Sequence, residues 1–136
     1  MAQIMDDKTD VLVVEDDKAM SVLTCMVLQA SGFAARPALD GGSGLREARS
    51  QVPHVILLDL MLPDMNGFEV CQELKRDEQT AHVPVIMLTA LADEESRLRG
   101  IALGARAYLT KPYNPKQLVD LITKLAAEPA LQRASA

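Results

Sequence analysis

Short apolar runs alternate with helical patterns along almost the whole chain, and this alternation restricts the fold more than any other feature. Most of the runs are continuous stretches of Val, Ile and Leu, which is typical of strands buried on both faces of a parallel sheet. They read VLVV, FAARPA, HVILLD, VPVIMLT and RAYLT, beginning at Val11, Phe33, His54, Val83 and Arg106. Strand–helix units of this number and length predict an α/β domain with an open, doubly wound sheet, not a closed barrel.

The helical patterns fill the spaces between these runs. They cover residues 18–30, 41–50, 68–76, 93–103 and 115–127. In the first helix, the apolar residues at helical spacing are expected to form the face that packs on the sheet: Ala19, Val22, Leu23, Met26, Val27 and Ala30. In the fourth helix, Glu95 and Arg99 lie one turn apart and are expected to form an ion pair.

The composition indicates one globular domain. The 136 residues, 49% of them hydrophobic, suffice for a core of ordinary size. We expect this domain to span residues 10–127, between a flexible segment at 1–9 and a flexible tail or linker at 128–136. Cys25 and Cys71 lack metal-site spacing and are expected to be reduced core thiols of a cytoplasmic protein.

Charge and hydropathy argue against several partners. The net charge of −5 disfavours direct binding to nucleic acid, and 3% aromatic residues disfavour base stacking. No apolar run approaches the roughly 20 residues that span a bilayer, so no membrane insertion is expected. The acidic N-terminal segment lacks the apolar core of a signal peptide.

Reactive side chains follow the predicted strands at the points where the strands end. They are Glu15, Asp16 and Asp17 after the first strand, Asp59 after the third, Thr89 closing the fourth and Lys111 after the fifth. Ligands of open α/β sheets bind at this carboxyl edge. Each residue has an ordinary explanation alone: Asp17 would cap the next helix, Thr89 would close a strand, and Lys111 would be a solvated loop charge. Their occurrence at consecutive strand ends favours a shared site.

A cation site beside a phosphate-binding lysine accounts for this set. Clustered carboxylates repel one another unless a cation lies among them, and an all-oxygen ligand set suits Mg²⁺ (or Mn²⁺). A carboxylate such as that of Asp59 can accept a phosphoryl group as an aspartyl-phosphate. Lys111 and the Thr89 hydroxyl would bind the oxygens of that group, and the small Ala90 would leave room for it.

These motifs resemble the receiver domain of two-component response regulators over about residues 10–127. The resemblance rests on VLVVEDD, VILLDLMLPDMNGFE, VPVIMLTA, GARAYLTKPY and NPKQL, in this order and at suitable spacing. It implies a flavodoxin-like (CheY-like) sheet with strand order 2-1-3-4-5. It also implies a phospho-acceptor switch in a phosphorelay, not a turnover enzyme. A sensor histidine kinase or a histidine phosphotransfer protein would load the switch, and a downstream protein or an output domain would respond to it.

The resemblance implies roles for the acidic residues. Asp59 would be the phosphoacceptor, with Glu15 and Asp16 as the acidic pair. Asp16, Asp59 and the Met61 backbone carbonyl would hold Mg²⁺ directly, while Glu15 would act mostly through water.

The resemblance also implies a phosphate-binding and switch set. Thr89, Ala90 and Lys111 would bind the phosphoryl group, and the peptide bond before Pro112 would be cis. In the switch, Thr89 moves toward the phosphoryl group and Tyr108 rotates into the vacated space. This movement would remodel the face made by the fourth helix, the fifth strand and the fifth helix. The alternative for Tyr108 is a half-buried tyrosine that only packs and hydrogen-bonds.

The chain departs from the family pattern at several positions. Gly44 stands where Ala is usual, so helix 41–50 is expected to be short or loose. Tyr113 replaces the more frequent Phe. Winged-helix regulators that form charge-paired dimers usually have an acidic pair before the strand-five Tyr and an Arg in the last helix. This chain has Arg106–Ala107 at the first place and Asp120–Leu121 at the second. We therefore expect a monomer or a weak dimer.

Other functions are compatible with the same fold. A phosphatase or phosphotransferase with an aspartyl-phosphate commonly needs a second carboxylate two residues after the nucleophile, where this chain has Met61. A pseudo-receiver acting as a protein-binding module usually lacks the Asp, Thr or Lys, and all three are present. A flavin-binding electron carrier needs stacking aromatic residues that this chain lacks.

The resemblance places Met61 and Leu91 beside the phosphorylation site. Both residues are apolar, which predicts slow hydrolysis of a phosphorylated Asp59.

Overall fold

A computed structural model describes residues 8–135, with side chains described through residue 128. Five parallel strands form one sheet in the order β2-β1-β3-β4-β5. The strands are β1 Asp10–Val14, β2 Ala34–Ala38, β3 Val55–Leu58, β4 Val85–Thr89 and β5 Ala107–Thr110. The helices are α1 Lys18–Ala30, α2 Gly41–Ser50, α3 Gly67–Arg76, α4 Glu94–Ala102 and α5 Pro115–Ser135. The predicted doubly wound fold and its strand order are confirmed.

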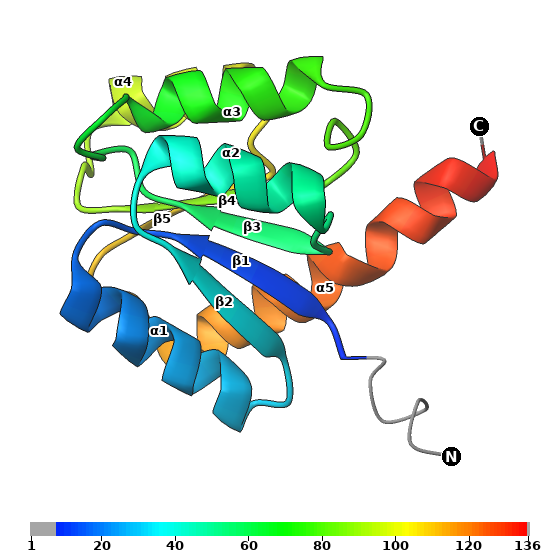
Figure 1. The fold of residues 1–136 in the computed structure, drawn as a ribbon, viewed down its shortest axis with the longest axis horizontal. Helices are drawn as coiled ribbons and strands as arrows, with labels where there is room; N and C mark the ends of the chain where they lie inside the picture. Colours follow the sequence, from blue (N-terminus) through cyan, green and yellow to red (C-terminus); the bar gives the residue numbers. More distant parts are fainter. Residues whose placement is uncertain (1–7, 136) are drawn as a thin grey trace.

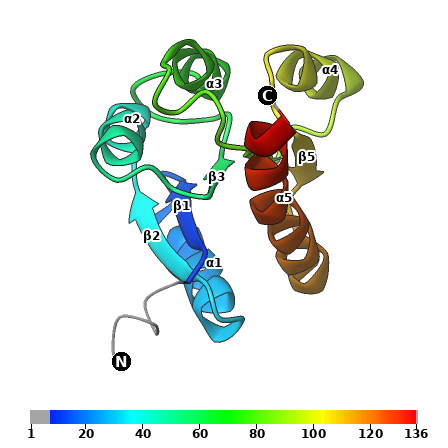
Figure 2. The ribbon, with the colours of Figure 1, turned by 90° about the vertical axis from the view of Figure 1, so that its right-hand side faces the viewer.

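The sheet lies between two helical layers, with α2, α3 and α4 on one face and α1 and α5 on the other (Figure 1, Figure 2). Successive residues of each strand point into opposite layers, as the two-residue period of a strand requires. In β3, Ile56 and Leu58 join the core beneath α2 and α3, whereas Val55 and Leu57 join the core beneath α1 and α5. Burial on both faces explains why the strands read as continuous apolar runs.

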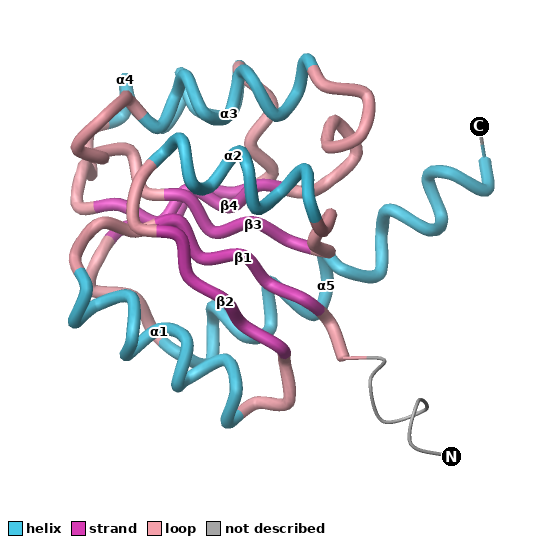
Figure 3. The backbone as a smooth tube through the Cα atoms, viewed as in Figure 1, coloured by secondary structure: helices cyan, strands magenta, loops and turns pink. Residues whose placement is uncertain are grey.

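The loops gather at the two edges of the sheet (Figure 3). Val14 of β1 lies beside Leu58 of β3, so the residues that follow these strands leave the sheet at the same level. The N–H of Asp59 donates to the carbonyl of Val14 at 3.0 Å, and Glu15 continues the ladder toward β2. This register brings the acids after β1 and β3 to one edge.

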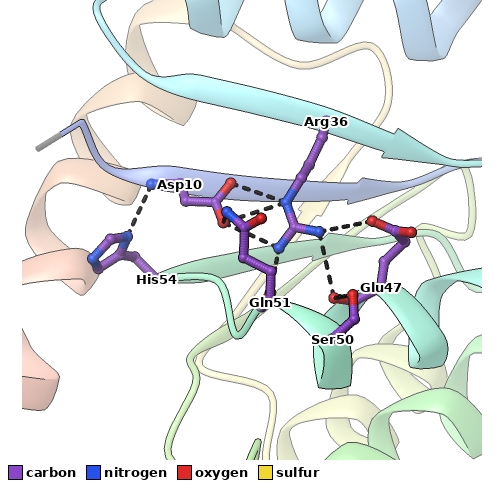
Figure 4. A network of polar contacts seen from close by, with 6 residues as sticks. All are labelled: Asp10, Arg36, Glu47, Ser50, Gln51 and His54. Atoms are coloured by element: carbon purple, nitrogen blue, oxygen red, sulfur yellow. Dashed lines mark hydrogen bonds and ion pairs between the residues drawn. The ribbon is translucent and has the colours of Figure 1, made fainter. Parts of the chain in front are cut away.

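A polar network closes the opposite edge, where the strands begin (Figure 4). Asp10 is buried, and its carboxylate accepts hydrogen bonds from Arg36 Nη2 at 3.0 Å and from Gln51 Nε2 at 3.3 Å. Arg36 also donates to the Glu47 carboxylate at 2.9 Å, and the Asp10 N–H donates to His54 Nδ1 at 2.9 Å. Because the carboxylate is paired, its burial is tolerated. The network ties β1 and β2 to the end of α2.

The face on which α1 packs differs from the prediction. Val22, Leu23 and Met26 are 55%, 52% and 59% exposed. The buried residues are instead Ser21, Thr24, Cys25 and Leu28. Small side chains let the helix approach the sheet closely, and the Thr24 hydroxyl finds a partner in Tyr113 at 3.0 Å. Counting apolar residues alone therefore selected the wrong face.

The Gly44 departure does not shorten α2. The helix runs over all ten predicted residues, Gly41–Ser50. Gly44 is buried against β1, and a Cβ atom added there would lie 3.0 Å from Cγ2 of Val14. The expectation of a short helix is wrong because the missing side chain allows close contact with the sheet.

The ion pairing of α4 also differs from the prediction. Among the described residues, Glu95 and Arg99 form no salt bridge: Arg97 pairs with Glu94 at 2.7 Å, and Arg99 lies 4.2 Å from the centre of the Phe68 ring. The arginine thus gains a cation–π contact between α4 and α3.

The backbone of α5 continues to Ser135, where the sequence predicts a tail. Residues 1–7 and 136 of the predicted flexible segments lie outside the described residues. Both cysteines are buried and unpaired, as predicted. No helix in the described part of the chain combines the length and apolar character needed to cross a bilayer.

Candidate functional site

Three carboxylates meet at the carboxyl edge of the sheet. Glu15 follows β1 and is 5% exposed, Asp59 follows β3 and is 6% exposed, and Asp16 is exposed. One oxygen from each residue can be chosen so that all three lie within 4.8 Å of one another. This spacing and the all-oxygen chemistry fit a hard divalent cation, and the exposed Asp16 leaves the cluster open to ions and water.

Lys111 closes the other side of this cluster. Its Nζ atom lies 2.9 Å from Oδ2 of Asp59 and also donates a hydrogen bond to the Glu15 carboxylate. The backbone holds this lysine in place, because its N–H donates to the Thr89 carbonyl at 2.8 Å. The following Lys111–Pro112 peptide bond is cis, the geometry that the resemblance implies. The ammonium group therefore lies between the two buried acids.

Burial and the neighbouring charges shift the pKa values of Lys111 and Glu15. Burial lowers the pKa of Lys111, but the hydrogen bonds and negative charges of Glu15 and Asp59 outweigh this effect and raise it. Burial raises the pKa of Glu15 despite its hydrogen bonds to Lys111 and to the Asp17 amide. The lysine therefore stays charged at neutral pH, and the site strongly favours a cation beside its acids.

The loop after Asp59 turns back over the carboxylate. The N–H of Met61 donates to Oδ1 of Asp59 at 3.2 Å, and Met61 forms an isolated antiparallel bridge with Asn66. Asn66 caps α3 with a capping box, in which the Glu69 carboxylate accepts a hydrogen bond from the Asn66 N–H. The backbone of Met61 is thus held beside the acidic cluster, while Met61 itself is 59% exposed.

Thr89 and Tyr108 are connected through Leu91. Thr89 is fully buried, and its hydroxyl accepts a hydrogen bond from the Leu91 N–H at 3.4 Å. The Tyr108 hydroxyl donates to the Leu91 carbonyl at 2.6 Å. Burial and the charge of Asp93 raise the pKa of Tyr108, which keeps the phenol protonated as a donor. One residue therefore contacts both side chains.

Comparison with known proteins identifies the family to which this chain belongs. Residues 11–123 match the family model described as the response regulator receiver domain. The chain is a response regulator receiver domain. Receiver domains bind Mg²⁺, and the cluster of Glu15, Asp16 and Asp59 could hold this ion.

Relatives and solved structures agree with this assignment. The receiver domain is 42% identical over 115 residues to the DNA-binding dual master transcriptional regulator RpaA of Synechocystis, covering 85% of this chain and 48% of RpaA. It is 43% identical over 112 residues to the phosphate regulon transcriptional regulatory protein PhoB of Escherichia coli, covering 82% of this chain and 49% of PhoB. The fold is similar to a CheY-like receiver domain protein from Methanospirillum hungatei, with a TM-score of 0.86 and 28% identity, over 93% of this chain and 99% of the other.

The receiver domain spans about half the length of the curated relatives that it matches. RpaA is named as a DNA-binding regulator and PhoB as a transcriptional regulator. These names do not match the expectation that the protein makes no contact with nucleic acid. That expectation rested on the net charge and the low aromatic content of this chain, which say nothing about the unmatched half of a relative.

Sequence reasoning missed polar contacts around the receiver site. Asp17 caps α1, as its ordinary explanation predicts, by accepting a hydrogen bond from the Met20 N–H at 3.1 Å. The hydroxyl of Tyr113, by contrast, meets that of Thr24, 89 positions away, and the carboxylate of Asp64 meets the start of α2. The only sequence signal for the contact of Tyr113 with Thr24 was the Tyr in place of the usual Phe. The sequence contains no signal for the contact of Asp64 with α2.

Proposed function

We propose that this receiver domain accepts a phosphoryl group on Asp59 from a phosphohistidine of a sensor histidine kinase or a histidine phosphotransfer protein. The observation that carries the proposal is the convergence of Lys111 Nζ on Asp59 Oδ2, at 2.9 Å, beside a cluster of three carboxylates. Few structural needs explain a buried acid, two further acids and a lysine at one sheet edge.

In this reaction a carboxylate oxygen of Asp59 attacks the phosphorus atom. An O–P bond forms, the N–P bond breaks, and its electron pair remains on the imidazole nitrogen, which takes up a proton. Lys111 lies where it can pair with the oxygens of the transferred group, and the Thr89 hydroxyl can donate to another. Ala90, next to Thr89, adds little bulk at this point.

Mg²⁺ (or Mn²⁺) is the proposed cofactor. Asp16, Asp59 and the Met61 carbonyl would hold it directly, and Glu15 would act mostly through water. When bound, the ion supplies positive charge that offsets the repulsion between the acids and the phosphoryl group. The exposure of Asp16 leaves the cluster an open side on which the ion could retain water.

We also propose that Thr89 and Tyr108 form the switch. If the Thr89 hydroxyl moves toward the phosphoryl group, it would give up the hydrogen bond that it accepts from the Leu91 N–H, and the Leu91 carbonyl is the acceptor of the Tyr108 hydroxyl. The outcome would be a population shift on the face made by α4, β5 and α5. The aspartyl-phosphate would then control a downstream partner or an output domain in the cytoplasm, and the relatives' names favour a transcriptional output.

A turnover phosphatase is the less favoured function. Such an enzyme would need an acid near the leaving group, and the residue two places after Asp59 is the exposed Met61. A pseudo-receiver is also disfavoured, because Asp59 and Lys111 are in contact and Thr89 lies at the end of the neighbouring strand β4. Slow autodephosphorylation is the only hydrolytic activity that we propose.

Labelling with a small acyl phosphate tests the function. Intact mass in the presence of Mg²⁺ should show one added phosphoryl group. Chelation of the metal should prevent this addition, and hydroxylamine should remove the group once it is attached. Asp59→Asn should abolish labelling, whereas the control Asp17→Asn should retain it because Asn also caps a helix. Unchanged labelling of Asp59→Asn would overturn the proposal. Full labelling without a divalent metal would overturn the roles of Glu15 and Asp16.

A further inference from the structure

The segment that carries Asp59 and Met61 is a loop between β3 and α3, and its two ends are firmly held. At the start, the Asp59 N–H belongs to the β1–β3 ladder. At the end, the Gly67 N–H donates to the Leu60 carbonyl at 2.9 Å, and Asn66 caps α3. The exposed middle of the loop is anchored by Asp64.

Asp64 reaches across to the first turn of α2. Its Oδ1 atom accepts the Gly41 N–H at 2.8 Å, and its Oδ2 atom accepts the Gly42 N–H at 2.8 Å. These hydrogen bonds, that from Gly42 first, lower the pKa of Asp64. Helix α2 already has its own cap, since Asp40 accepts the Ser43 N–H at 2.7 Å. Asp64 is therefore a second, separate connection to this helix terminus.

The neighbouring residue, Met65, makes an independent contact with the same terminus. A Cβ atom added at Gly41 would lie 2.4 Å from Cγ of Met65 and 3.0 Å from Cγ2 of Val70. The glycine thus leaves the room into which the loop packs. Polar and apolar contacts together fix the middle of the loop against α2.

We propose that Asp64 is a positioning residue for metal binding: it ties the loop to α2 and so keeps the Met61 carbonyl at the acidic cluster. Met61 and Asn66 pair in the bridge that closes this turn, and Asp64 lies within the turn, so release of Asp64 from α2 would loosen the turn and with it the Met61 carbonyl at its base. This inference rests on the proposed function, because it assumes a metal ion at Glu15, Asp16 and Asp59.

The test compares Asp64→Ala with Asp40→Ala, which removes a hydrogen bond from the same helix terminus without touching the loop. Mg²⁺ dissociation constants are measured by calorimetric titration of the full chain, and thermal midpoints by circular dichroism. Asp64→Ala is expected to weaken Mg²⁺ binding about tenfold, as loss of a group that orients a ligand does. Asp40→Ala should lower the thermal midpoint but change Mg²⁺ affinity by less than about twofold. Asp64→Asn, which keeps one acceptor, should fall between wild type and Asp64→Ala.

Labelling by the acyl phosphate separates positioning from chemistry. At low Mg²⁺ the Asp64→Ala chain should be labelled slowly, and saturating Mg²⁺ should restore the wild-type rate. Equal Mg²⁺ affinities of the two alanine variants, or a labelling defect that saturating Mg²⁺ does not rescue, would overturn the role of Asp64. Failure of the wild-type chain to bind Mg²⁺ or to be labelled would instead overturn the proposed function.

Discussion

At the scale of residues, Asp59 is tolerated after four buried aliphatic residues because Lys111 offers it a counter-charge. Lys111 is itself mostly buried, with a side chain 16% exposed, and it contacts two carboxylates. Removing one partner from such a cluster leaves buried charge uncompensated, which costs more than the pair itself contributes. The lysine therefore serves the stability of the site as well as its proposed chemistry.

Lys111→Met should accordingly lower the free energy of unfolding by about 3 kcal/mol at neutral pH without divalent metal. Urea unfolding followed by circular dichroism measures this change. Addition of Mg²⁺ should narrow the difference from wild type, because the ion supplies charge to the same acids. A variant as stable as wild type in the absence of metal would contradict this stabilising role of Lys111.

The main site residues were predictable because one rule of topology places them. Glu15, Asp59 and Lys111 each follow a strand, and strands of a parallel sheet end at a common edge. The contacts of Asp64 and Tyr113 were not predictable, since their partners lie 23 and 89 positions away and obey no local spacing. Such contacts depend on how loops fold over helices, which hydrophobic periodicity does not describe.

At the scale of elements, α1 shows the limit of periodicity. The helix was predicted with its correct bounds, but with its apolar stripe turned toward the sheet. In the structure, Leu28 and three small side chains with hydroxyl or thiol groups face the sheet, whereas Val22, Leu23 and Met26 face outward. Bulk and close approach decided the orientation here, not hydropathy alone.

The orientation of α1 can be checked by truncating one residue from each face. Leu28→Ala should cost about 2–5 kcal/mol of unfolding free energy, because Leu28 is fully buried. Met26→Ala should change it by less than about 0.5 kcal/mol, since Met26 is 59% exposed. Urea unfolding of both variants measures the difference. A larger loss of unfolding free energy for Met26→Ala than for Leu28→Ala would instead support the predicted face.

The start of α4 should confer a pH dependence. Hydrogen bonds from the Ser96 backbone and side chain hold the pKa of Asp93 below its ordinary value of 3.8. A lowered pKa in the folded state stabilises the fold above the ordinary value, and this contribution is lost as pH falls through the folded value. Asp93→Ala should therefore melt below wild type at pH near 6, and the gap should shrink at pH near 3. An unchanged or wider gap in acid would contradict the assignment. Thermal melting at both pH values provides the measurement.

At the scale of the whole molecule, two ion pairs within the chain involve charged residues next to β5 and in α5. Arg106 forms an ion pair with Glu128, and Lys116 pairs with Asp120 at 2.9 Å. Arg106 and Asp120 occupy positions at which the chain departs from the charge pattern of winged-helix dimers. Internal pairing leaves them less available for pairs between two copies.

Light scattering after size exclusion should therefore give the mass of a monomer, both before and after treatment with beryllofluoride and Mg²⁺. Beryllofluoride stands in for the phosphoryl group, so any dimer that depends on activation would appear in the treated sample. A stable dimer whose interface maps to α4, β5 and α5 would contradict this expectation.

Asp59 is the residue that we propose to carry the phosphoryl group. Borohydride reduces an acyl phosphate to an alcohol, which marks the labelled aspartate permanently as homoserine. After labelling with the acyl phosphate and Mg²⁺, reduction and proteolysis, peptide mass mapping should find homoserine at position 59 and an unmodified Asp16. Conversion at another acid, or no conversion in a chain that has gained a phosphoryl group, would contradict the assignment of Asp59 as the phosphoacceptor.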